Sequence, residues 1–515
     1  MTTLTMNRRQ FLAGSAALGL AAALPTAGRA ATPKQGGTFK AAIGDFSSTE
    51  SLDPALAETR YQLNLNWQIR NNLAEVGPGG VIHPELAEAW EGSPDAKRWV
   101  FKIRKGVEFH NGKKLTAEDV VYSINLHRKE GTHSFGKPFV APIEEMKATS
   151  ELEMTVQLKE GNVGFPEMLT LPVFLIVPDG ETDFQKGMGT GGYVLESFEP
   201  GVRSVAKRNP NYWKADRAHF DSVELLAIKD TTARQNALVA GKIHAFNFVD
   251  LKTADLLKKQ PGLQILQVAG KAHYSFPMLM DVAPFDNNDV RMAMKLAIDR
   301  EEQLKRILNG YGSIGNDQPL TAAYQFFDPG IPQHSYDPDK AKFHLKKAGH
   351  SDLSVQLYTS EVPYAGATDA SVLYKEQAAK AGINIEVIKA PEDGYWSDVW
   401  AKKPFCAARW SGRVNADVMI GGVYSTDAIK AGWNETHMSD PRVDKLLIAA
   451  RTEFDVAKRA QIYADLQTII HDDGGAVIPV LADFVDAASD KIAFDKLSSD
   501  WDLDGSRASE RWWFA

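Results

Sequence analysis

Two strand–helix–strand segments constrain the fold of this chain more than any other feature. In the first, apolar residues predict a buried strand over 223–228, a capped start at Thr232 predicts a short helix, and residues 243–246 predict a second strand. Residues 355–387 repeat this order around a longer helix. A strand that returns to its sheet through a helix favours parallel pairing, so we expect an α/β protein.

Local signals predict further elements along the chain. Apolar residues recur at every second position over 99–103 and again over 152–158, as they do in a half-buried strand. Thr116 stands three residues before Asp119, a spacing typical of a helix start. Asp337 and Asp440 each precede a proline, which predicts two more helices that begin at those positions.

The N-terminus has the order of an export signal. Arg8 and Arg9 precede an apolar run over 11–24, and small residues follow as far as Ala30. The paired arginines are typical of a twin-arginine signal, and we expect cleavage near Ala30 rather than an uncleaved anchor. The run is shorter than the about 20 residues that span a bilayer, and no nearby cysteine can take a lipid anchor. Residues 1–30 are therefore predicted to be a signal peptide, and the mature protein to be soluble in the periplasm.

Charge and cysteine content exclude several classes of protein. The formal net charge is −8, and the first thirty residues carry arginines but no acid, so the rest of the chain is more acidic still. An acidic surface repels phosphate backbones and anionic lipid, which argues against binding to nucleic acid or a membrane surface. Cys406 is the only cysteine, so an intrachain disulfide and a thiolate metal cage are excluded. Its apolar surroundings predict a small buried residue rather than a nucleophile.

A series of motifs runs through the chain in a fixed order. They are SLDP at 51–54, PELAEAW at 84–90, GVEFHNG at 106–112, LTAEDV at 115–120, GTGGY at 189–193, RNPNYW at 208–213 and YDPDKA at 336–341. In this order they resemble the extracellular solute-binding proteins of peptide, nickel and opine ABC transporters, over nearly the whole chain that follows the signal. The ordered run from residue 51 to residue 120 is the most specific part of the resemblance.

The resemblance implies a periplasmic binding protein-like α/β fold (type II, cluster C-like), in which a hinge joins two lobes and an extra domain is inserted. Lobe I would be discontinuous, over residues 31–75, 187–275 and 485–515. The extra domain would occupy residues 76–186, and lobe II residues 276–484. Ligand would close the cleft between the lobes, as in other periplasmic binding proteins.

The resemblance also implies a function. The chain would be the periplasmic substrate-binding component of an ABC importer that captures a small peptide, an opine or an acidic or phosphorylated sugar-like solute. Its partners would be transmembrane permease subunits with a cytoplasmic ATPase. We expect a monomer that catalyses no reaction and takes no cofactor, metal or nucleic acid. Two alternatives are an exported cofactor-dependent enzyme, for which no haem, molybdenum or flavin motif is found, and a periplasmic chaperone-like binder of unfolded segments.

The segment from Trp410 to Arg413 is the main candidate for ligand contact. In peptide-binding relatives, a similar Trp-x-Gly-Asp segment places an aspartate against the ammonium group of the peptide, whereas Arg413 stands at that position here. A guanidinium in a closed cleft prefers a carboxylate or a phosphate, which it binds through two hydrogen bonds. We therefore expect Arg413 and Trp410 to contact an anionic ligand. The alternative is that Arg413 pairs with a protein acid such as Asp417, which is itself a candidate binding residue.

Three further residues are candidates for the cleft. Trp433 and Asn434 resemble a family segment near the ligand, where an aromatic face and an amide suit sugars or amide backbones, although Trp433 fits core packing equally well. Tyr61 follows the first motif closely and is expected to reach the cleft, together with Asn64 and Asn66.

Two other motifs, at residues 189–193 and 471–473, are predicted to be structural rather than ligand-binding. The glycines of GTGGY lack the lysine and hydroxyl residue of a phosphate-binding loop, so a tight turn is predicted. His471, Asp472 and Asp473 follow a helix predicted over 458–470, and we expect a solvated helix end there rather than metal ligands.

Overall fold

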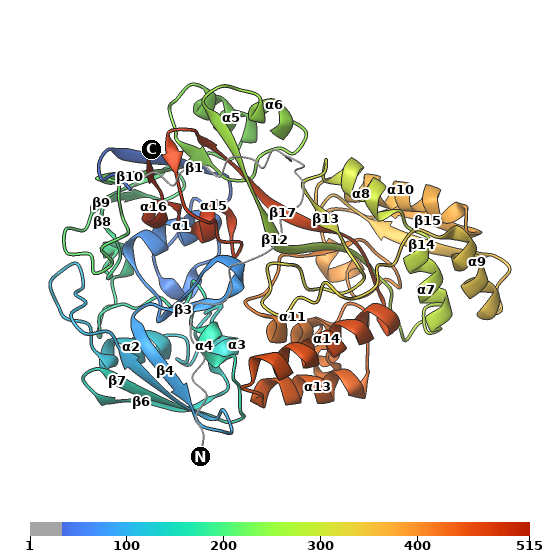
Figure 1. Ribbon diagram of the computed structural model, residues 1–515, viewed down its shortest axis with the longest axis horizontal. Helices are drawn as coiled ribbons and strands as arrows, with labels where there is room; N and C mark the ends of the chain where they lie inside the picture. Colours follow the sequence, from blue (N-terminus) through green and yellow to red (C-terminus); the bar gives the residue numbers. More distant parts are fainter. Residues whose placement is uncertain (1–32) are drawn as a thin grey trace, which may run out of the picture.

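Two bodies joined by two long strands make up the fold. The computed structural model describes residues 33–515, so the predicted signal at 1–30 lies outside the described residues. The long strands are β12 (Leu263–Pro277) and β17 (Ala476–Ser489), which pair antiparallel and run from one body into the other (Figure 1). Two register shifts interrupt the pairing, between Val268 and Ala272 and between Tyr274 and Phe276.

The first body contains a mixed sheet that also includes the two long strands. Its central strand β1 (Thr38–Ile43) is parallel both to β10 (Ser222–Ala227) and to β11 (Ala245–Phe246), and α5 (Thr231–Val239) connects those two strands. The two strands are parallel, as predicted, but they do not pair with each other, because β1 lies between them. The remaining elements are β8 (Tyr193–Glu199), β9 (Arg203–Arg208), α1 (Arg60–Ile69), α6 (Ala254–Lys258), α15 (Asp502–Ser506), α16 (Ala508–Arg511), β18 (Ile492–Ala493) and β19 (Trp513–Phe514).

A second, antiparallel sheet completes this body. Its strands follow the order β4 (Ala87–Gly92), β5 (Arg98–Ile103), β7 (Glu153–Leu158) and β6 (Ile143–Ser150). The alternation predicted for β5 is confirmed, because Trp99, Phe101 and Ile103 are all buried. The predicted helix start is confirmed too, since Asp119 accepts a hydrogen bond from the backbone of Thr116 at 2.8 Å. Also present are α2 (Ala117–Asn125), α3 (Lys137–Val140), α4 (Phe165–Met168), β2 (Ala74–Val76) and β3 (Ile82–Pro84).

The second body is built from a parallel strand pair and two groups of helices. The pair β14 (Leu353–Thr359) and β15 (Ile383–Lys389) is connected by α10 (Ala367–Ala379), which confirms the second predicted strand–helix–strand unit. Asp337 and Asp440 cap the starts of two helices, as predicted. The other elements are α7 (Asn288–Leu296), α8 (Arg300–Ile307), α9 (Pro338–Lys347), α11 (Ala416–Tyr424), α12 (Thr426–Lys430), α13 (Pro441–Thr452), α14 (Val456–Asp473), β13 (Gly312–Ile314) and β16 (Ala408–Trp410).

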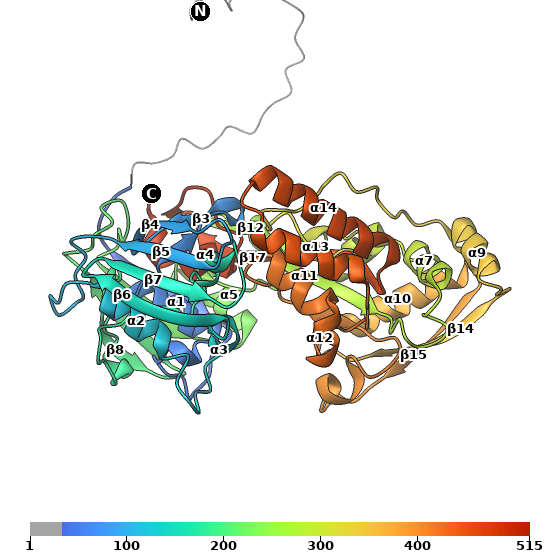
Figure 2. The same ribbon diagram turned by 90° about the horizontal axis from the view of Figure 1, so that it is seen from below.

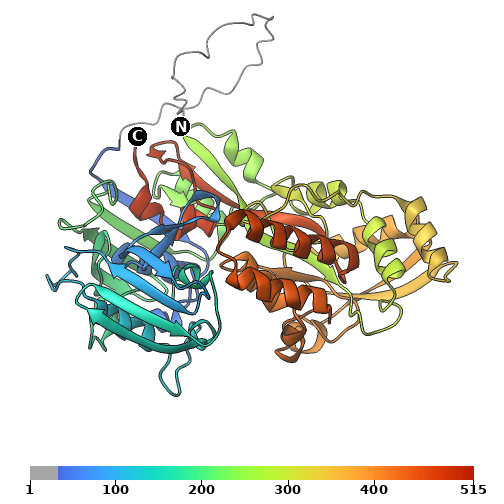
Figure 3. The same ribbon diagram turned by 60° about the horizontal axis from the view of Figure 1, so that its bottom comes forward.

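The helices α3 and α4 lie at the edge of the first body that faces α11 and α12 of the second (Figures 1 and 2). Seen from a third direction, the sheets of the first body and the helices α11–α14 lie side by side, with the long strands behind them (Figure 3). Across this boundary the backbone N–H of Val163 donates to the carbonyl of Arg451 at 2.8 Å. Within residues 33–515, no helix is both long enough and apolar enough to cross a bilayer.

Candidate functional site

A cavity of about 540 Å³ lies between the two bodies, where the long strands join them. Residues from both bodies line it, so it is a cleft rather than a hole within one core. The first body contributes Phe135, Phe139, Thr170, Leu171, Asp500 and Trp501, and the second contributes Ser411, Gly412, Arg413, Val418 and Trp433. Lys271, on β12, lies where these two walls meet. A concave, largely apolar site with a few charged groups is typical of a binding site for a small ligand.

Lys271 connects the long strand to both walls of the cavity. The residue is 3% exposed, and its Nζ lies 2.5 Å from Oδ1 of Asp500 and donates to the carbonyl of Val414 at 3.1 Å. Because Asp500 belongs to the first body and Val414 to the second, one ammonium group bonds to both. Gly412 packs against Lys271 so closely that an added Cβ would lie 2.4 Å from the lysine Cβ, and its φ of +93° also favours glycine.

Asp500 and Trp501 are held in place by an unusual turn that follows them. Residues 503–506 all have φ between 48° and 71°, a left-handed conformation that costs side-chain-bearing residues about 1–2 kcal/mol each. Buried hydrogen bonds hold this turn: Leu503 N–H donates to Asp486 at 2.6 Å, and Ser498 N–H donates to Asp504 at 2.7 Å. Burial, together with the neighbouring charge of Asp502, raises the pKa of Asp486 to about 8. Strain of this kind is often retained at ligand sites.

Arg413 is the cation of the cavity that has no acidic partner among residues 33–515. Its guanidinium stacks on the ring of Trp410, 4.7 Å from the ring centroid, and its Nη1 donates to the carbonyl of Gly412 at 2.9 Å. The backbone N–H of Arg413 donates to the hydroxyl of Tyr324 at 2.8 Å, which fixes the segment. Burial lowers the pKa of the guanidinium from its usual value, as expected for a cation that has lost part of its hydration.

A tryptophan cluster, formed by Trp400, Trp410 and Trp433, supports this wall. The ring centroids of Trp410 and Trp433 are 6.3 Å apart, and each lies 5.9 Å from that of Trp400. Beneath the cluster, the buried carboxyl of Glu435 accepts from Trp400 Nε1 at 2.6 Å and from Ser275 Oγ at 3.1 Å. Burial raises the pKa of Glu435, and these hydrogen bonds oppose that effect. The cluster therefore holds Trp433 at the cavity from behind.

Comparison with known proteins identifies the family. The model of the bacterial extracellular solute-binding proteins, family 5 (middle region), matches residues 81–428. The chain belongs to this family. Its members are non-catalytic solute-binding proteins, and this one is the substrate-binding protein of an ABC importer, which implies permease and ATPase partners. A twin-arginine translocation signal matches residues 5–25, which confirms the predicted signal type.

Relatives of this solute-binding protein carry the names of different ligands. The chain is 26% identical to the di/tripeptide-binding protein 1 of Pseudomonas aeruginosa, over 82% of this chain and 85% of the relative. It is 24% identical to a glutathione-binding protein of Pectobacterium atrosepticum, over 96% of both chains. It is 26% identical to the heme-binding protein A of Haemophilus influenzae, over 78% of this chain and 80% of that protein. The relatives therefore leave the ligand class open.

Solved structures confirm the fold, which is a mixed α/β periplasmic binding protein fold of cluster C. The periplasmic murein tripeptide-binding protein MppA, in an unliganded open form, has a TM-score of 0.83 at 19% identity, over 94% of this chain and 99% of that one. The protein AgaA of A. tumefaciens R10, in complex with agropinic acid, has a TM-score of 0.73 at 22% identity, over 93% of this chain and 99% of that one.

The structure brings three of the six predicted site residues together. Arg413 and Trp433 line the cavity, and Trp410 lies directly beneath the guanidinium of Arg413. Asp417 is not the partner of Arg413: it is buried on α11, where it binds Arg451 Nε at 2.8 Å. The alternative in which Arg413 pairs with Asp417 is therefore wrong.

Asn434 and Tyr61 lie away from the cavity. The side-chain amide of Asn434 is buried and donates to the carbonyls of Ser425 and Met438 at 3.0 and 2.8 Å. The hydroxyl of Tyr61 is buried in the first body and donates to Leu225 O at 3.1 Å. Both side chains therefore hydrogen-bond within the core around them rather than facing the cavity. Three cavity residues, Lys271, Asp500 and Trp501, were not predicted from the sequence.

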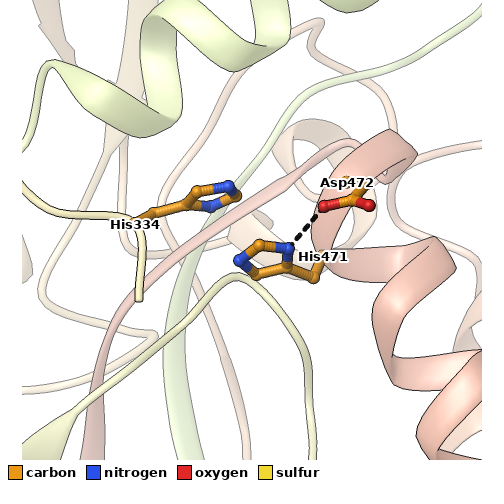
Figure 4. A group of neighbouring side chains, drawn as sticks. All are labelled: His334, His471 and Asp472. Atoms are coloured by element: carbon orange, nitrogen blue, oxygen red, sulfur yellow. Dashed lines mark hydrogen bonds and ion pairs between the residues drawn. The ribbon is translucent and has the colours of Figure 1, made fainter. Parts of the chain in front are cut away.

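The helix end predicted over residues 471–473 differs from expectation. α14 runs on to Asp473, and His471 is buried against His334 with the ring centroids 3.7 Å apart (Figure 4). Nδ1 of His471 bonds to Asp472 at 2.7 Å, and Nδ1 of His334 bonds to Asp317 at 2.8 Å. The two imidazole planes are nearly parallel, so their lone pairs do not converge on one point as the ligands of a metal must. The predicted burial of Cys406 is confirmed.

Proposed function

We propose that this solute-binding protein captures a small acidic solute in the cavity between its two bodies, and that Arg413 binds the anionic group. One observation carries the proposal: the guanidinium is a partly buried cation at the cavity wall whose only hydrogen-bond acceptor within residues 33–515 is the Gly412 carbonyl. A partly desolvated cation normally has an anionic partner, because its lost hydration must be replaced. A planar guanidinium fits a carboxylate or phosphate through two parallel hydrogen bonds.

The neighbouring charges support an anion of low charge. Lys271 and Asp500 neutralise each other, so Arg413 leaves the cavity with one net positive charge. A short peptide bound by its carboxylate, an opine, or an acidic or phosphorylated sugar-like solute would each supply the missing charge. Agropinic acid, the ligand of one structural neighbour, is by its name also an acid.

The same proposal covers movement and delivery. β12 and β17 are the hinge, with lobe I at residues 31–75, 187–275 and 485–515, its extra domain at 76–186, and lobe II at 276–484. Ligand bonded to both walls favours closure, and the closed form is the one presented to the permease. The signal is cleaved near Ala30, and a monomer without a lipid anchor is released into the periplasm.

Native mass spectrometry of gently purified protein tests this function first. We expect a single co-purified compound, bound one to one, that carries a carboxylate or phosphate. Small-angle scattering should then show a smaller radius when that compound is added back to stripped protein. An unchanged radius contradicts the hinge, and stoichiometric binding of unfolded polypeptide instead would favour the chaperone-like alternative.

The charge of the ligand is tested with a double-mutant cycle. Arg413→Ala should weaken binding of the acid by roughly 2–5 kcal/mol, as removal of one partner of a buried charge pair does, and should change binding of its neutral amide or ester much less. Arg413→Lys should weaken it partially, because lysine keeps the charge but loses the planar fork. Arg409→Ala is the matched control, since Arg409 is exposed on β16, just before the Arg413 segment, and does not line the cavity. Equal acid-to-neutral ratios in Arg413→Ala and the wild type contradict the proposal.

A further inference from the structure

Aromatic residues on both walls of the cavity bear on which kind of acid binds. Trp433, on the wall of the second body, is 51% exposed although the tryptophan cluster holds it from behind. Phe135, on the wall of the first body, is 48% exposed, and Phe139 and Trp501 line the same cavity. Large aromatic side chains left open to solvent within one concave site are typical of a surface that a ligand covers.

Two of these aromatic rings, Trp501 and Trp433, are held in place by neighbouring side chains. Trp501 lies under the guanidinium of Arg60, 4.2 Å from the ring centroid, and Arg60 Nε is itself 3.3 Å from Asp502. Trp433 is fixed by its contacts with Trp400 and Trp410. Rigid aromatic rings lose little conformational freedom on binding, so their contact area contributes to affinity at small entropic cost.

The charged groups, in contrast, gather at one place. Lys271 contacts Gly412 and bonds to Asp500 and to the carbonyl of Val414. Arg413 lies between Gly412 and Val414 in the sequence. Leu171, Pro172 and Val418, which are apolar, line the cavity together with the aromatic residues. The cavity is thus amphipathic, with its cations on one part of the wall and flat apolar faces on the rest.

We propose that the ligand is an acid with a flat aromatic or heteroaromatic body, whose anionic group binds Arg413 and whose ring lies between Trp433 and the aromatic residues of the first body. This inference rests on the proposed function and narrows it. A sugar acid would place several hydroxyls against walls with few hydrogen-bonding groups, and each unpaired hydroxyl weakens binding. An extended peptide would leave backbone N–H and C=O groups unpaired in the same way.

Calorimetry on ligand-stripped protein tests the ligand class with three probes. Indole-3-propionate has the anion and the aromatic ring, indole-3-propionamide has the aromatic ring without the charge, and galacturonate has the charge without an aromatic ring. We expect indole-3-propionate to bind about tenfold more tightly than either of the others, because only it uses both parts of the wall. The protein is stripped by unfolding in guanidinium chloride and refolding, and circular dichroism verifies that it has refolded.

Two tryptophan variants supply a matched comparison. Trp433→Ala should weaken indole-3-propionate about tenfold and leave galacturonate unchanged, since only the indole uses that face. Trp396→Ala should change neither: Trp396 is 44% exposed and its ring centroid lies 5.8 Å from that of Trp400, but it does not line the cavity. The pair therefore separates loss of a ligand-facing ring from general loosening of the tryptophan cluster.

The outcomes distinguish this inference from the proposed function. If both acids bind equally well and Trp433→Ala affects them equally, the aromatic ligand class is wrong while the role of Arg413 stands. If indole-3-propionate and its amide bind equally in the wild type and in Arg413→Ala, the anionic anchor is wrong, and this inference is lost with it. Absence of measurable binding by indole-3-propionate, in protein that still binds galacturonate, also overturns it.

Discussion

Two groups of buried charges in this protein differ in how completely they are paired. In the ion cluster of the first body, Lys214 Nζ lies 2.8–2.9 Å from carboxylates of Glu75, Glu85 and Glu510, and Arg507 binds Glu85 and Glu510 at 2.8 and 3.0 Å. In the cavity, Lys271 and Asp500 pair in the same way, but Arg413 has no acid among the described residues. In a saturated cluster every charge already has partners and none is left to bind a ligand, whereas a surplus cation at a cavity wall is a binding group.

The largest expected effect comes from removing one acid of the saturated cluster. Glu85 accepts from Lys214, Arg507, Asn71 and the backbone of Asn72, and it is fully buried. Glu85→Gln leaves two buried cations short of a partner and should lower the free energy of unfolding by about 3–5 kcal/mol. Urea denaturation measures the loss, and ligand affinity should not change in the folded variant.

The control for this change lies three residues along the chain. Glu88 is exposed on β4, so Glu88→Gln should alter the free energy of unfolding by less than about 0.5 kcal/mol. If the two variants are equally stable, the cluster does not have the structural role that its geometry indicates.

Acid should weaken the same cluster. Burial alone would raise the pKa of Glu510, but Lys214 and Arg507 outweigh it and lower this pKa to about 2, from 4.5. A lowered carboxyl pKa contributes stability that is fully present above about pH 4.5 and is lost as the pH falls toward 2, by up to about 3 kcal/mol. Urea midpoints measured from pH 7 to pH 2.5 should fall in this window, and less steeply in Lys214→Met. Equal slopes in both proteins would contradict the assignment.

Fold and site differ in how far the sequence predicts them. The caps at Asp337 and Asp440 and the alternation at 99–103 depend on neighbours within a few residues, and the structure has each of them. Lys271 and Asp500 are 229 positions apart and meet only in the folded chain, so no local pattern marks them. Tyr61 shows the converse: its place after a motif indicated the cleft, but its hydroxyl is used inside the first body.

A smaller effect is expected where a paired charge of the cavity becomes a surplus charge. Asp500→Asn leaves Lys271 without its acid and should lower the free energy of unfolding by about 1.5–3 kcal/mol, the range for a charge-assisted hydrogen bond. The cavity then carries a second uncompensated cation, so acidic ligands should bind more tightly than to the wild type and restore part of the lost stability. Thermal unfolding with and without ligand measures both changes. If an acid binds more weakly to Asp500→Asn, Asp500 contacts the ligand directly rather than neutralising Lys271.

The smallest effect is expected at Asp417, the acid that the sequence placed beside Arg413. Its carboxylate binds Arg451 at 2.8 Å, and Arg451 is partly exposed and can be rehydrated when the pair is broken. Asp417→Asn should therefore cost about 1 kcal/mol of stability, near the upper value for pairs that reach solvent. Burial outweighs Arg451 and raises the pKa of Asp417, so the wild type gains stability as the pH falls through this pKa and the variant does not; the loss should therefore be larger at low pH. Ligand affinity and the preference for acids over neutral analogues should stay within about twofold of the wild type. A change in that preference would mean that Asp417 acts on the ligand together with Arg413, and the distinction between saturated pairs and the surplus cation would no longer identify the binding residues.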